Sequence, residues 1–118
     1  MNLPFYRLVK LKIEVVIPQN DVKPINDALK KINIGGITIS KVKGRGKTIA
    51  EKLHASKGTE MYIPEFSDKY KLEVIVSDDK EKDTINIIRG NSKIGKIFIW
   101  PIARAVDIES GLENEKAI

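Results

Sequence analysis

A glycine- and lysine-rich stretch, "SKVKGRGKTIAEK", contains the residue types that hold phosphate groups. Gly44 and Gly46 flank Arg45, and lysines stand on both sides of them. Glycine lets backbone N–H groups approach an anion closely, and cationic side chains neutralise its charge. The same composition also fits a basic turn whose glycines adopt positive φ and whose lysines are solvated. The stretch alone leaves both interpretations open.

Charged residues also recur on two similar segments, "KIEVVI" and "KLEVIV". Glu14 and Glu73 occupy equivalent places in them, and this repetition favours a structural role for at least one glutamate. Lys69 and Lys71 are two positions apart, so on a strand their side chains share one face. They are either solvated or part of an anion site.

The residues that carry catalytic or metal chemistry are sparse. His54 is the single histidine, and with Glu51 it would supply only half of a metal site. There is no cysteine, no Ser/His/Asp arrangement and no Walker A glycine spacing. We therefore expect neither an enzyme nor a metal protein.

The chain is 118 residues long, which predicts a single domain over 1–118. No apolar run approaches the roughly 20 residues that span a bilayer, and the N-terminus does not resemble a secretion signal. A cytoplasmic location is the expectation. The net charge of +5 suits nucleic acid, acidic lipid or anionic metabolites, and equally a solvated lysine-rich surface.

Hydrophobic periodicity predicts two β-α-β halves. Each half begins with a strand rich in β-branched residues, continues with an amphipathic helix and returns as a second strand. The expected strands are Lys12–Ile17, Gly36–Lys43, Lys71–Val76 and Lys96–Ile102, with a short last strand at Ala103–Ile108. Right-handed crossovers then give an α+β, ferredoxin-like βαββαβ antiparallel sheet with both helices on one face.

The sequence also predicts what happens at the other face of the sheet and where the first helix begins. Val16 and Ile75 make the open face partly apolar, from which we expect a homo-oligomer. Asp21 is the expected cap of the first helix, with Pro24 in its first turn.

Two segments fall outside the regular elements. The connection 44–68 has no clear periodicity and is far longer than the median loop, and such loops are usually functional or disordered. It carries His54, Met61 and Tyr62. The chain ends in an acidic tail at 109–118.

The order of four motifs resembles the PII signal-transduction family over about Lys12 to Ile108. The motifs are "GGITISKVKGRG", "KGTEMY", "KYKLEVIV" and "GKIFIWPIARAVDI". The resemblance implies a ferredoxin-like homotrimer that binds ATP or ADP between subunits, often with Mg and 2-oxoglutarate. It also implies that 44–68 is a T-loop, which contacts a transporter or metabolic enzyme through residues such as His54, Met61 and Tyr62. The positions that match nucleotide or anion contacts are Val16, Thr38, Gly44, Arg45, Gly46, Lys69, Glu73, Gly95 and Lys96.

The sequence departs from the family pattern at three places. The loop "RGNSKIGKIF" is about four residues shorter than the family's phosphate loop. Asp107 and Glu109 replace two arginines that grip phosphate, and Thr48 replaces a glutamine used for Mg and 2-oxoglutarate. These changes predict weaker ATP binding and argue against Mg and 2-oxoglutarate as ligands.

Two alternatives stay open. In one, the PII-like cleft has lost ATP and 2-oxoglutarate and takes another anion, or only a protein partner. In the other, the basic sheet binds nucleic acid as an RRM does, although the expected aromatic residues are missing and Phe98 and Trp100 stand alone on one strand. We expect no nucleic-acid partner and no membrane insertion.

Overall fold

The computed structural model describes residues 10–45, 53–54, 61–62 and 65–113. Within them the strands are β1 (Lys10–Ile17), β2 (Ile37–Gly44), β3 (Leu53–His54), β4 (Met61–Tyr62), β5 (Ser67–Ser77) and β6 (Ile97–Pro101). The helices are α1 (Gln19–Lys31) and α2 (Glu81–Asn91), and a 3-10 turn, η1 (Asp78–Lys80), leads into α2.

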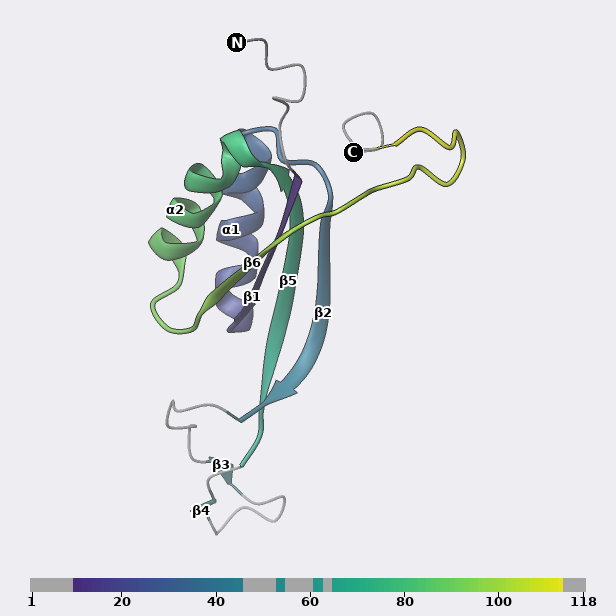
Figure 1. The fold of residues 1–118 in the computed structure, drawn as a ribbon. Coiled ribbons are helices and arrows are strands. Elements are labelled where there is room, and N and C mark those ends of the chain that lie inside the picture. The colour runs from purple at the N-terminus through teal and green to yellow at the C-terminus, as the bar shows by residue number, and fades with distance from the viewer. Residues whose placement is uncertain (1–9, 46–52, 55–60, 63–64, 114–118) are drawn as a thin grey trace.

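The main sheet has the strand order β2-β5-β1-β6, and all of its neighbours are antiparallel. The two repeated segments lie side by side in its centre as β1 and β5, with Glu14 directly opposite Glu73. Both helices cover one face of this sheet (Figure 1). The predicted α+β, ferredoxin-like arrangement is confirmed.

The hydrophobic core lies between the helices and the covered face of the sheet. Strand alternation sends every second residue of β1 and β5 into it, and the helical period of α1 adds Ile25 and Leu29. The buried hydrophobic residues are Ile13, Val15, Ile17, Ile25, Leu29, Ile34, Leu72, Val74, Val76 and Ile88. This packing leaves the opposite face of the sheet uncovered in the protomer.

The predicted start of the first helix was wrong. The helix begins at Gln19 with Pro18 at the N-cap, because the fixed φ of this proline, −64°, already suits a helix entry. Pro24 therefore lies inside α1, and Asp21 accepts a hydrogen bond from Ser92 Oγ at 2.7 Å. Asn33, with φ of 63°, follows the helix and reverses the chain before Gly35 is reached.

The structure differs from the sequence prediction at two further segments. β2 and β5 continue as a two-stranded ribbon away from the body of the molecule, so the connection between them is shorter than 44–68 (Figure 1). The predicted last strand at 103–108 is reduced to one bridge, Val106 to Glu113. Its chain reverses because Asp107 accepts hydrogen bonds from the N–H and the hydroxyl of Ser110, each at 2.8 Å.

Candidate anion site at two edges of the sheet

The uncovered face of the sheet carries four of the nine predicted anion-contact residues. In the strand register Thr38 lies opposite Glu73, and Val16 lies opposite Lys71. Lys69 is on β5, two residues from Lys71 and therefore on the same face. The 39% exposure of Val16 shows that this face is open in the protomer. The structure thus places Val16, Thr38, Lys69 and Glu73 together on one surface.

Glu73 is held at the centre of this face by two lysines. Lys12 Nζ lies 3.3 Å and Lys71 Nζ lies 3.4 Å from its carboxylate. Lys12 also contacts Glu14 at 3.7 Å and lies 5.2 Å from the ring centroid of Trp100. The hydrogen bond from Lys12 lowers the pKa of Glu73 from its usual range despite some desolvation. The lysines also offset the repulsion between Glu73 and Glu14, which face each other across the strands.

The lowered pKa of Glu73 predicts how stability depends on pH. A carboxylate whose pKa is lower in the folded state adds stability above its unfolded pKa, and this stability is lost as pH falls through the folded pKa. We expect Glu73→Gln to flatten the fall in Tm below about pH 4.3, the ordinary pKa of a glutamate in an unfolded chain. Thermal melts of the wild type and Glu73→Gln from about pH 3 to about pH 7 would check this. Parallel curves of Tm against pH for the two proteins would contradict it.

The first edge of the sheet, at the end of β2, carries Gly44 and Arg45. Gly44 is part of the strand and pairs with Ser67, and a Cβ added there would meet nothing within 4 Å. The interpretation of Gly44 as a turn residue with positive φ is therefore wrong, because β2 runs on through it. Arg45 pairs with Glu65 at 2.9 Å, and Gly46 lies outside the described residues.

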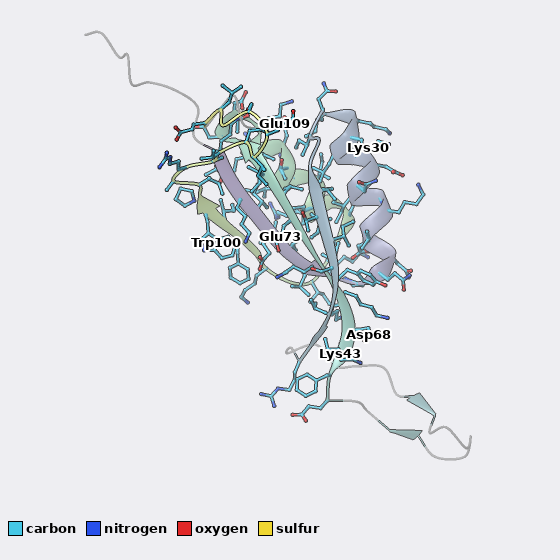
Figure 2. All side chains as sticks on the ribbon, turned by 90° about the vertical axis from the view of Figure 1, so that its right-hand side faces the viewer. Lys30, Lys43, Asp68, Glu73, Trp100 and Glu109 are labelled. Atoms are coloured by element: carbon cyan, nitrogen blue, oxygen red, sulfur yellow. The ribbon has the colours of Figure 1, made fainter. Side chains whose placement is uncertain are left out.

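Ion pairs connect the two strands of the ribbon near this edge. Asp68 lies 3.2 Å from Lys43 and 3.6 Å from Lys41, at the point where the ribbon leaves the body (Figure 2). The hydrogen bond from Lys43 lowers the pKa of Asp68, and the charge of Lys41 adds to this. An anion that approaches these lysines would compete with Asp68.

The other edge of the sheet, before β6, carries Gly95 and Lys96. Gly95 has φ of +126°, and a Cβ there would lie 3.3 Å from the carbonyl oxygen of Val16. This loop borders a cleft of about 340 Å³ that Arg89 and Lys93 also line. Among the residues that the structure describes, neither Arg89, Lys93 nor Lys96 forms an ion pair.

Arg89 and Lys93 were not among the predicted anion contacts. Helical spacing could not have predicted this grouping, because α2 ends at Asn91 and both Lys93 and Lys96 lie in the loop that follows it. In the structure Arg89 and Lys93 supply positive charge beside the Gly95 loop.

The two groups of predicted contacts lie at opposite edges of the sheet. Gly44 belongs to β2 and Gly95 leads into β6, and β5 and β1 separate these strands. At about 4.8 Å between neighbouring strands, three spacings amount to roughly 14 Å. A single phosphate group cannot touch both edges of one protomer.

Asp107 and Glu109 lie on a C-terminal arm that extends away from the sheet (Figure 1). The hydrogen bonds from Ser110 lower the pKa of Asp107, so its carboxylate is ionised and engaged in its own turn. Glu109 is exposed. Within one protomer neither carboxylate lies among the predicted anion contacts that the structure describes.

The predicted partner-contact residues fall on the short ladder beyond the ribbon. His54 on β3 pairs with Met61 on β4, and Leu53 pairs with Tyr62. Regular structure thus occurs in a segment for which no strand was predicted, because two-residue strands leave no measurable periodicity.

The described residues contain neither a metal-binding group nor a membrane-spanning helix. No group of three or more histidine, cysteine, aspartate or glutamate side chains within 10–45, 53–54, 61–62 and 65–113 is arranged to hold a metal ion. In the same ranges neither α1 nor α2 has the length and hydrophobicity to cross a bilayer.

Comparison of the sequence with protein families gives a match over nearly the whole chain. The family described as nitrogen regulatory protein P-II matches residues 10–111. The chain is 37% identical to nitrogen regulatory protein P-II of Haemophilus influenzae over 114 residues, which are 91% of this chain and 98% of that protein. It is 35% identical to nitrogen regulatory protein P-II 1 of Escherichia coli with the same coverage.

Comparison of the structure gives the same family of folds. Arabidopsis thaliana PII bound to citrate superimposes with a TM-score of 0.73 and 27% identity, over 93% of this chain and 92% of that one. The Bacillus subtilis GlnK–ATP complex gives a TM-score of 0.72 at 24% identity, over 93% of this chain and 98% of that one.

Proposed function

This chain belongs to the nitrogen regulatory protein P-II family, and from that premise we propose that it is a homotrimeric, cytoplasmic regulator that senses a small anion in clefts between subunits. Members of this family are signalling proteins and not enzymes. The single domain over 1–118 would then act through binding and shape change alone.

One observation carries this proposal. The Gly44 edge and the Gly95 edge each hold part of the predicted site, and two strands separate them in the protomer. A cyclic trimer has heterologous contacts, in which one edge of a subunit meets the opposite edge of its neighbour. Such a contact would join Gly44 and Arg45 of one subunit to Gly95 and Lys96 of the next.

The open face of the sheet supplies a surface that such an assembly would cover. Phe98 and Trp100 on β6 are 51% and 44% exposed, and their ring centroids are 6.2 Å apart. The C-terminal arm adds Val106 and Ile108, which are also exposed. Exposed apolar groups of this kind mark interaction surfaces.

We infer an adenine nucleotide as the ligand, with ATP bound more weakly than in family members that keep both arginines. The negative charges of Asp107 and Glu109 would repel a triphosphate if the arm of a neighbour reached the cleft. Arg89 and Lys93 would offset part of this repulsion, since both line the cleft beside Gly95. These charges favour a ligand with fewer phosphates. We do not propose Mg or 2-oxoglutarate as ligands.

The alternative is that the cleft binds another small anion, or only a protein partner. The Arabidopsis thaliana relative was solved with citrate, an anion without a base or a ribose. A tricarboxylate would need the lysines but not an adenine pocket.

The segment 44–68, with His54, Met61 and Tyr62, is the proposed contact with a target. We propose that the target is a transporter or a metabolic enzyme, and that the role lies in nitrogen regulation. The ion pairs of Asp68 with Lys41 and Lys43 lie at the base of this segment, so an anion bound there would change the restraint on it.

Light scattering and isothermal titration of the full chain test the proposal together. We expect a mass of three chains of 13.3 kDa each, and saturable binding of ADP or AMP that is tighter than that of ATP without magnesium. Citrate binding without nucleotide binding would select the alternative. A monomer would remove the shared cleft, and salt-sensitive binding of RNA in place of both ligands would replace the regulator by a nucleic-acid-binding module.

A further inference from the structure

A second cleft is bordered by elements at the other end of the sheet from the β2–β5 ribbon. Figure 1 shows where these elements lie. Its volume is about 340 Å³, near the lower limit for small-molecule pockets. Three parts of the chain border it: the start of β1, the turn between α1 and β2, and the end of β5 with η1. None of the predicted anion contacts that the structure describes lines it.

Among the described residues that line this cleft, two are lysines and none is an aspartate or glutamate. Lys10 and Lys80 line it, and neither forms an ion pair with any described residue. Asp78 and Asp79 follow the lining residue Ser77 in sequence, but both are exposed and neither is part of the lining. The lining therefore has a net positive charge.

Lys80 is fixed in place by both helices. Its Nζ donates a hydrogen bond of 2.7 Å to the carbonyl oxygen of Ile32, at the end of α1. Its own carbonyl oxygen accepts a hydrogen bond of 2.8 Å from the hydroxyl of Thr84, which is fully buried in α2. The ammonium group is thus held at the cleft before any ligand arrives, and an ammonium has further donors to offer an anion.

Backbone and hydroxyl donors complete the polar wall. Gly35 and Gly36 line the cleft, and their N–H groups make no backbone hydrogen bond among the described residues. Ser77 lies directly opposite Lys10 in the strand register, so its hydroxyl is beside that lysine's strand. Glycine N–H groups without side chains in front of them approach anions readily, and a Cβ at either glycine would meet nothing within 4 Å.

Asn33 also lines the cleft, and the remaining three lining residues are apolar. Ile34 and Val76 are almost fully buried beneath the cleft, and Ile75, the neighbour of Val76 on β5, points to the opposite face of the sheet. We propose that this cleft is a second ligand site, for a phosphate or carboxylate group carried on a short apolar chain. The cationic wall would hold the anionic group, and Ile34 and Val76 would contact the stem.

NMR titration of the uniformly ¹⁵N-labelled full chain with n-butyl phosphate tests this proposal, with the amide chemical shifts as the readout. We expect saturable shifts at Gly35, Gly36, Ser77 and Lys80. Inorganic phosphate lacks the stem and should bind more weakly, and n-butanol lacks the charge and should give no saturable shift. Carboxylate specificity is tested in parallel with pentanoate.

Lys10→Met is the decisive variant, because the Lys10 side chain forms no ion pair within the described residues whose loss would disturb the fold. It should weaken the apparent affinity for n-butyl phosphate roughly tenfold, the effect of losing one charge-assisted contact. Lys82→Met is the matched control, since Lys82 is exposed on α2 and does not line the cleft. It should leave the affinity within about twofold.

Three results would overturn the proposal. The first is no saturable shift around the cleft, and the second is shifts confined to Gly95 and its neighbours. The third is equal weakening by Lys10→Met and Lys82→Met, since this would mean that the anion senses only the net charge.

Discussion

Replacing Gly44 with valine is expected to abolish nucleotide binding while leaving the fold unchanged. Gly44 lies in extended strand and a Cβ there meets no atom within 4 Å, so a β-branched residue is accommodated in the protomer. The same side chain would stand where the ligand's phosphate needs to approach the backbone. A blocked approach removes the hydrogen bonds that the backbone would donate to the phosphate, and a loss of about 3 kcal/mol weakens binding by about 100-fold.

Gly36→Val is the matched control for this change. Gly36 precedes the other end of β2, and a Cβ there also meets nothing within 4 Å. Isothermal titration with ADP should show binding for Gly36→Val and none for Gly44→Val, with Tm values that agree within a few degrees. Full ADP affinity in Gly44→Val would remove this glycine from the site.

Gly95→Ala is expected to lower stability as well as binding. The φ of +126° is a conformation that alanine adopts only with strain, and its Cβ would press on the carbonyl oxygen of Val16 at 3.3 Å. Strain of this kind costs about 1–3 kcal/mol. The loop would relieve it by moving away from β1, and this movement would displace Lys96.

Gly90→Ala is the control in the same region. Gly90 lies within α2, and an added Cβ meets nothing within 4 Å, so alanine should stabilise the helix by about 0.5–1 kcal/mol. Urea unfolding of the two variants and the wild type measures both changes. Equal unfolding midpoints for Gly95→Ala and Gly90→Ala would contradict the strain assigned to Gly95.

The elements that were predicted well are those with strong periodicity. β1 and β5 are short runs rich in β-branched residues, so their type and the ferredoxin-like arrangement followed from pattern and crossover handedness. The start of α1 did not follow, because aspartate is a preferred N-cap residue and the sequence favoured Asp21 over Pro18. The strand at 103–108 failed for a similar reason, since the Asp107 turn depends on hydrogen bonds from Ser110.

The candidate site was predictable by residue type and not by geometry. The lysines and glycines could be identified from the sequence, but the contacts of Lys12 and Lys71 with Glu73 depend on the register between β1 and β5. The separation of Gly44 from Gly95 likewise follows from strand order. Because one protomer cannot bring these two glycines to the same ligand, a site that uses both requires two subunits.

The central claim is that each anion site combines the Gly44 edge of one subunit with the Gly95 edge of its neighbour. Gly44→Val and Lys96→Glu disable opposite halves, so each variant alone should bind no ADP. When the two are unfolded, mixed in equal amounts and refolded together, random assembly pairs two intact halves at about one quarter of the interfaces. Isothermal titration of the mixture should therefore recover about a quarter of the wild-type ADP sites. No recovery, in a mixture that light scattering and mass spectrometry show to contain mixed trimers, would mean that each site lies within one chain.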